Sequence, residues 1–203
     1  MKDFHFNEII RRKLLILGDI GSGKTAFTAR LLAEALAILS PNDITVIDMA
    51  PRRRDFKGAS VGGRLTDFMN APTGVRILTP APTPVAPRIE GLTAGDVLLF
   101  ARSNHESIDR VLEKYSADPT PILFMNDVSM YLHAGEPVNL LNVVASAKTV
   151  VMNSYAGVSL QDDRGSSVSQ HERDGLALLK RAVDQVMILI AAPSLASQQE
   201  TDK

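Results

Sequence analysis

The chain has 203 residues, 45% of them hydrophobic, and its formal net charge at pH 7 is −1. This size allows one buried core, and we expect a single domain over residues 1–192 followed by a flexible tail over 193–203. The near-neutral charge gives no specific reason to expect nucleic acid or an anionic membrane as a partner. No apolar run approaches the ~18 residues that span a bilayer, and the start of the chain lacks the apolar stretch of a secretory signal, so we expect a cytoplasmic protein. The absence of cysteine excludes disulfides, thiolate metal sites and cysteine nucleophiles.

The first predicted strand, Lys13 to Leu17, leads into a glycine-rich loop, and apolar residues at helical spacing then predict a helix from Lys24 to Leu39. The loop fits the pattern G-x-x-x-x-G-K-[ST], in which glycines let successive backbone N–H groups curl around a phosphate. Lys24 is placed to reach the β- and γ-phosphates, and the Thr25 hydroxyl to coordinate Mg²⁺. The predicted nucleotide-binding residues here are Gly18, Asp19, Ile20, Gly21, Ser22, Gly23, Lys24, Thr25 and Ala26.

On residues Gly18 to Thr25 the chain resembles the P-loop NTPases. The resemblance implies a nucleoside triphosphate with Mg²⁺ as cofactors. It also implies a three-layer α/β/α domain with a mostly parallel central sheet. It does not decide between hydrolysis, phosphoryl transfer and nucleotide sensing.

Asp48 ends the next predicted strand, Ile44 to Asp48, and can be interpreted in three ways. The stretch Asp48-Met49-Ala50-Pro51 is similar to the D-x-D-P stretch of the MinD/ParA and nitrogenase-iron-protein group, although Ala50 replaces the second acid. In P-loop kinases an acid at this place can instead contact or deprotonate the acceptor. The third interpretation is a plain turn residue. We include Asp48 among the candidate catalytic residues.

Two long segments flank a predicted strand over Val75 to Leu78. The first, Met49 to Arg64, is polar and carries arginines at 52–54, which either bind an anionic substrate or lie solvated at the surface. The second, Thr79 to Pro87, is rich in proline, which removes hydrogen-bond donors, so it is expected to be extended. Loops this long in a compact domain are usually lids, binding loops or linkers.

Strands then alternate with helices, which predicts a parallel sheet covered on both faces. Two capping boxes are expected to open helices, at Ser103 to Glu106 and at Ser169 to Glu172. The remaining predicted elements are a helix at Thr93–Arg102, a strand at Ile122–Met125, a helix at Val138–Ala147, a strand at Thr149–Met152 and a strand at Val186–Ile190.

Asp127 follows the most hydrophobic predicted strand at a distance of one residue. Large apolar residues followed by an acid at a strand end are the general form of the Walker B aspartate, which holds Mg²⁺ directly or through water. We therefore expect Lys24 and Asp127 to be catalytic, and Thr25 and Asp127 to bind the metal. Val128 stands where AAA+ and RecA-like ATPases carry a glutamate. Either Asn126 or an acid elsewhere in the chain must position the attacking water, or hydrolysis is slow or absent.

Asn153 stands where P-loop GTPases carry N-K-x-D and where AAA+ proteins place a polar sensor. The lysine and acid of the GTPase signature are missing, so ATP is expected, with GTP as the alternative. Asn153 is predicted to be a sensor or base contact, the other reading being an ordinary loop residue. The histidines have no ligand spacing, and each is expected at the surface or at a cap: His5, His105, His133 and His171.

Two classes of function follow. The first is an ATP-dependent hydrolase or phosphotransferase, a small-molecule kinase being the variant that Asp48 and the arginines favour. The second is a nucleotide-gated switch with little turnover, in which the nucleotide orders the long segments for a partner. An unidentified anionic substrate or protein is the expected partner in either case. A strand lying between the Lys13–Leu17 and Ile122–Met125 strands would favour the ATPase class, and direct adjacency the kinase–GTPase class.

Overall fold

The computed structural model describes residues 4–56, 58–70 and 73–190. Within these residues, six strands form a parallel sheet in the order β5-β2-β6-β7-β1-β8. The inner strands are buried almost without interruption, as expected for a parallel sheet covered on both faces. The strands of this sheet are β1 (Lys13–Gly18), β2 (Ile44–Asp48), β5 (Arg76–Leu78), β6 (Ile122–Asn126), β7 (Thr149–Tyr155) and β8 (Gln185–Leu189).

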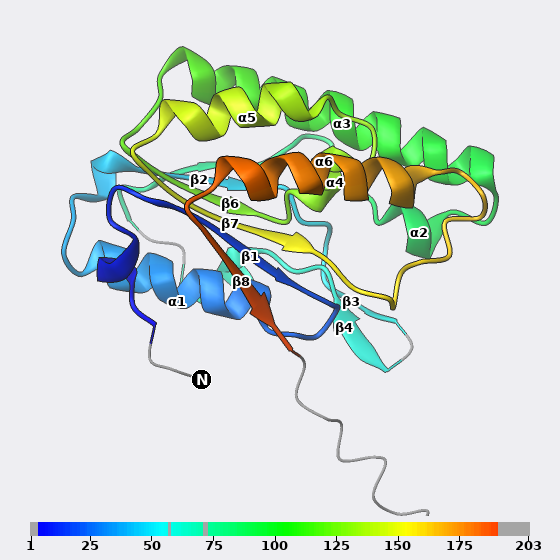
Figure 1. Cartoon of the computed structure of the whole chain (residues 1–203), viewed down its shortest axis with the longest axis horizontal. Coiled ribbons are helices and arrows are strands. Elements are labelled where there is room, and N and C mark those ends of the chain that lie inside the picture. The colour runs from blue at the N-terminus through cyan, green and yellow to red at the C-terminus, as the bar shows by residue number, and fades with distance from the viewer. Residues whose placement is uncertain (1–3, 57, 71–72, 191–203) are drawn as a thin grey trace, which may run out of the picture.

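Helices cover both faces of the sheet, so the fold has three layers (Figure 1). Helix α1 (Lys24–Leu36) lies on one face, and α3 (Ala94–Ala117), α5 (Pro137–Ser146) and α6 (Val168–Ala182) lie on the other. Two large apolar clusters correspond to the two interfaces between sheet and helices. Shorter helices are η1 (Phe6–Ile9), η2 (Pro41–Asp43), η3 (Leu65–Asp67), α2 (Pro87–Glu90) and α4 (Ser129–Leu132).

Both predicted capping boxes are wrong. Helix α3 runs through Ser103 without a break, because it already begins at Ala94, where Thr93 and Asp96 form its capping box. Helix α6 begins at Val168, and Glu172 turns into the interior instead of capping. Glu172 is used there in a tertiary contact, its ion pair with Arg88.

The two long segments lie at the carboxyl edge of the sheet (Figure 1). The polar one contains a small antiparallel hairpin, β3 (Arg54–Phe56) and β4 (Ala59–Val61). The proline-rich one has no regular structure before Pro87, which opens α2. The predicted tail over 193–203 lies outside the described residues. Among the helices that the structure describes, none combines the length and apolarity needed to cross a membrane.

Candidate functional site

The glycine-rich loop joins β1 to α1 and has the backbone that a phosphate cradle requires. Gly21 and Gly23 have φ values of 69° and 84°, in the left-handed region that side chains disfavour. Gly18 is constrained for another reason. A Cβ there would lie 2.6 Å from the carbonyl oxygen of Leu189 in β8. The glycines of the pattern therefore serve both the curl of the loop and its close fit to the sheet.

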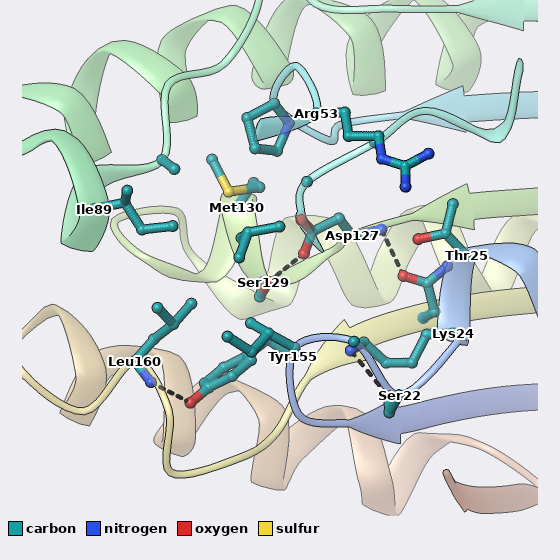
Figure 2. A pocket seen from close by; sticks show the side chains of 18 of the residues that line it. Ser22, Lys24, Thr25, Arg53, Ile89, Asp127, Ser129, Met130, Tyr155 and Leu160 are labelled. Carbon is teal, nitrogen blue, oxygen red and sulfur yellow. Dashed lines mark hydrogen bonds between the residues drawn. The ribbon is translucent and has the colours of Figure 1, made fainter. Parts of the chain in front are cut away.

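Lys24 folds back onto this loop. Its Nζ donates to the main-chain oxygen of Asp19 at 2.7 Å and lies 3.4 Å from Ser22 Oγ (Figure 2). Burial lowers the pKa of Lys24, while the carboxylates of Asp127 and Asp19 raise it. The ammonium thus has neutral partners that a phosphate can replace with stronger, charge-assisted bonds.

The carboxylate of Asp19 ties the loop to the segment after β7. It accepts hydrogen bonds from the backbone N–H groups of Ile20, Val158 and Ser159 at 2.7–3.2 Å. Gly157 lies against it so closely that any side chain there would overlap the carboxylate. Burial raises the pKa of Asp19, but these backbone donors outweigh it and hold the pKa below its usual range. Asp19 therefore acts on the shape of the loop through its side chain.

A cavity of about 260 Å³ lies against the loop. The predicted residues Ile20 to Ala26 line it, together with Asp127 and Asn153. The long polar segment contributes Arg53, whose guanidinium lies over the Phe68 ring at 5.9 Å. The other lining residues are Pro51, Val61, Gly62, Gly63, Phe68, Ala86, Pro87, Arg88, Ile89, Ser129, Met130, His133, Tyr155 and Leu160.

Asp127 lies between β6 and α4 and faces the cavity. Its backbone is left-handed, with φ 59°, and its N–H donates to Asn153 Oδ1 at 3.0 Å. The Ser129 hydroxyl donates to its carboxylate (Figure 2). Burial raises the pKa of Asp127, while the Ser129 hydrogen bond and the Lys24 charge lower it. The structure thus brings Lys24 and Asp127 within electrostatic reach of each other across the cavity.

Behind the cavity wall, buried polar side chains form a chain of hydrogen bonds across three strands. Asn153 Nδ2 donates to Thr28 Oγ1 and to Asn126 Oδ1, both at 2.9 Å. Asn126 Nδ2 donates in turn to Asp48 Oδ1 at 2.7 Å. The other Asp48 oxygen accepts the N–H of Leu65 at 2.7 Å. We call Thr28, Asn153, Asn126 and Asp48 the amide chain.

Of the amide chain, Asn153 also lines the cavity, whereas Asp48 lies outside the described lining. Burial raises the pKa of Asp48, and its hydrogen-bond donors, Asn126 first, lower it. Both Asp48 oxygens accept bonds from the protein itself. Asp48, Asp127 and Asn153 therefore lie at one edge of the sheet, but only Asp127 and Asn153 line the cavity.

Sequence reasoning missed a buried cluster at the cavity wall, formed by Arg88, His133 and Glu172. Arg88 Nη1 donates to Glu172 Oε2 at 2.6 Å, and Arg88 Nη2 lies 3.2 Å from His133 Nε2. His133 is the C-cap residue of α4, which fits the expected capping role, but it is 4% exposed and therefore does not lie at the surface. No spacing along the chain signals this cluster, because its members come from α2, the end of α4 and α6.

The parallel sheet with helices on both faces is the three-layer α/β/α fold that the sequence predicted, and the loop between β1 and α1 and the acid after β6 lie at its carboxyl edge. Strand β7 lies between β1 and β6.

No protein-family model matches the chain, and neither does any curated protein. Among solved structures, the chain is similar to Pif1 helicase from Candida albicans, with 11% identity and a TM-score of 0.40, over 91% of this chain and 37% of the helicase. It is also similar to the protein of project PH0250 from Pyrococcus horikoshii OT3, with 10% identity and a TM-score of 0.42, over 93% of this chain and 87% of that one. The chain thus spans little more than a third of the helicase, and both likenesses are too distant to bear on function.

Proposed function

We propose that this protein binds Mg·ATP in the cavity beside the P-loop and hydrolyses it. The observation that carries the proposal is the placement of Lys24 and Asp127 on the lining of one cavity, with a glycine-rich loop and a helix start between them. Backbone N–H groups at a helix start and a lysine suit the triphosphate. The carboxylate of Asp127 suits the Mg²⁺ ion that accompanies the triphosphate.

Thr25 and Asp127 are the proposed Mg²⁺ ligands. Both line the cavity and both offer hard oxygen atoms, which Mg²⁺ prefers. The ion would neutralise charge that develops on the phosphate oxygens. This chain's residues would hold the nucleotide: the loop backbone and Lys24 bind the phosphates, and Asn153 holds the backbone of Asp127 in place.

The strand order supports the ATPase class over a small-molecule kinase, because β7 separates β6 from β1. It also gives Asn153 the position of a polar group on the intervening strand. Asp48 would position Asn126, since both Asp48 oxygens already accept hydrogen bonds from the protein. The weak similarity of its segment to the MinD/ParA group adds no separate function.

A nucleotide-gated switch is the second candidate. It is favoured by Val128 in place of a glutamate, and by the two long segments, which supply Arg53 and Pro87 to the cavity wall. A nucleotide would contact both segments, so it would be able to fix them for a partner.

The discriminating experiment measures binding and turnover together. We expect ATP to bind in the presence of Mg²⁺ and to outcompete GTP, with measurable release of inorganic phosphate. Tight ATP binding without release, alone or with a panel of phosphoryl acceptors, would favour the switch. Failure to bind ATP or GTP would refute both candidates.

A further inference from the structure

The cavity extends well beyond the P-loop. Figure 2 shows Ile89 and Leu160 on the side away from Lys24 and Thr25, with Tyr155 between Leu160 and Lys24. Met130 adds a further apolar wall. We call this part, lined by Arg88, Ile89, Met130, His133 and Leu160, the distal end. A triphosphate on the loop would leave the distal end to another group.

The distal end carries the buried cluster of Arg88, His133 and Glu172. These side chains are fixed from several directions: Arg88 bonds Glu172 Oε2, its Nη1 lies 3.3 Å from Ser169 Oγ, and its guanidinium lies 4.9 Å from the centre of the Tyr155 ring. Burial raises the pKa of Glu172, but His133 and Arg88 outweigh it and keep the pKa below its usual range. The cluster is therefore rigid and charged at an otherwise apolar wall.

One nitrogen of the His133 ring has no hydrogen-bond partner within the described part of the chain. His133 Nε2 lies 3.2 Å from Arg88 Nη2 and 3.6 Å from Glu172 Oε1, so both described polar contacts of the ring are made through Nε2. Among residues 4–56, 58–70 and 73–190, Nδ1 has no hydrogen-bond partner although it is buried. A buried polar atom without a partner is costly, and such groups call for an explanation.

We infer that the distal end is a second ligand site, for a small molecule that presents an oxyanion on a compact apolar body. With a proton on Nδ1, His133 suits a carboxylate or phosphate-ester oxygen, as does the Arg88 charge, and Ile89, Met130 and Leu160 suit the body. The site lies on the γ-phosphate side, because α4 follows Asp127 directly. That placement rests on the proposed nucleotide site, whereas the oxyanion chemistry does not.

The test uses the full chain with labelled histidine side chains, observed by NMR while Mg²⁺ and a non-hydrolysable ATP analogue fill the P-loop. The probes are glycerol 3-phosphate and isobutyrate, with glycerol and isobutanol as their neutral counterparts. We expect at least one anion to shift the His133 resonances saturably and its neutral counterpart to leave them unchanged. Which anion acts distinguishes a phosphate ester from a carboxylate.

Variants then separate a built site from general anion binding. His133→Gln should weaken anion binding at least fivefold, while His105→Gln should not, although His105 Nδ1 is also buried without a partner in the described chain. Leu160→Glu, on a partly exposed loop, should weaken it at least fivefold by repulsion, and Leu160→Gln should not. The second pair keeps the test valid if His133→Gln fails to fold.

Three outcomes would overturn the inference. The first is that neither anion shifts the His133 resonances, which would mean that an ordered water alone satisfies Nδ1. The second is that the ATP analogue by itself shifts His133 and blocks the anion, so that the distal end holds the nucleoside. The third is that the paired variants bind the anion equally. Loss of analogue binding with retained anion binding would count against the proposed function and leave this site standing.

Discussion

The cavity wall and the amide chain lie side by side at the same edge of the sheet, yet their polar groups are used differently. Lys24 on the wall bonds a main-chain oxygen that a phosphate can replace, and His133 keeps a buried nitrogen without a partner in the described chain. In the amide chain, the side-chain amides of Asn126 and Asn153 form hydrogen bonds with each other and with neighbouring groups of the protein. At this edge of the sheet, polar groups of Lys24 and His133 that are replaceable or without a described partner thus lie beside amide groups whose hydrogen bonds are made within the protein.

The largest expected effect comes from breaking the amide chain. Asn126→Leu keeps the size of the side chain but removes partners from Asp48 Oδ1, Gly63 O and Asn153 Nδ2, all buried. Unsatisfied buried groups are costly, so the free energy of unfolding in urea should fall by roughly 3 kcal/mol or more. Asn142→Leu on the exposed face of α5 is the matched control and should stay within about 0.5 kcal/mol of wild type. Equal stability of the two variants would show that the chain is not structural.

Lys24→Ala should give the opposite result. The free energy of unfolding without nucleotide should change little, because the lysine forms hydrogen bonds only with neutral groups of its own loop, Asp19 O and Ser22 Oγ. ATP affinity, measured by calorimetry, should fall roughly tenfold to a hundredfold, the worth of a charge-assisted bond. Lys148→Ala, before β7 at the far edge, should bind ATP like wild type. Unchanged ATP binding by Lys24→Ala would remove the lysine from the site.

Asp127→Asn tests whether the wall acid carries a cost of burial. Since the folded pKa of Asp127 is raised above 3.8, the folded state holds the proton more tightly than the unfolded chain, and this residue's contribution to stability falls as pH rises through that pKa. The variant lacks this loss. Without nucleotide, its free energy of unfolding should therefore rise relative to that of wild type as pH rises, and should at least equal it at neutral pH. Asp48 titrates in both proteins and cancels from the difference. A pH-independent deficit in urea unfolding would contradict the account.

The smallest effect is expected on amide hydrogen exchange in the polar segment 52–64, measured at residues 52–56 and 58–64. Arg53 lines the cavity, so ATP should slow amide exchange there more than over α6. The comparison is internal to one protein, measured with and without nucleotide. Exchange that is already slow without ATP, or unaltered by it, would leave these arginines as surface residues and weaken the switch alternative.

The sequence predicted the part of this site that lies close together along the chain. The loop, Lys24, Thr25 and the strand-end acids follow from local pattern and from the rule that parallel strands end at one edge. Which strand-end residue faces the cavity does not follow, because Asp48 and Asp127 read alike in sequence and differ in their tertiary hydrogen bonds. The Arg88, His133 and Glu172 cluster joins three distant elements, so no local signal was present, and Glu172 resembled a helix cap.

The central claim is that Lys24 and the acid Asp127 form one Mg·ATP site. Its most direct test is the titration of wild type and Asp127→Asn with ATP, with and without Mg²⁺. We predict that Mg²⁺ tightens ATP binding by wild type at least fivefold and has little effect on the variant, which has lost a metal ligand but keeps Lys24. ATP binding that is absent, or equally sensitive to Mg²⁺ in both proteins, would contradict the account.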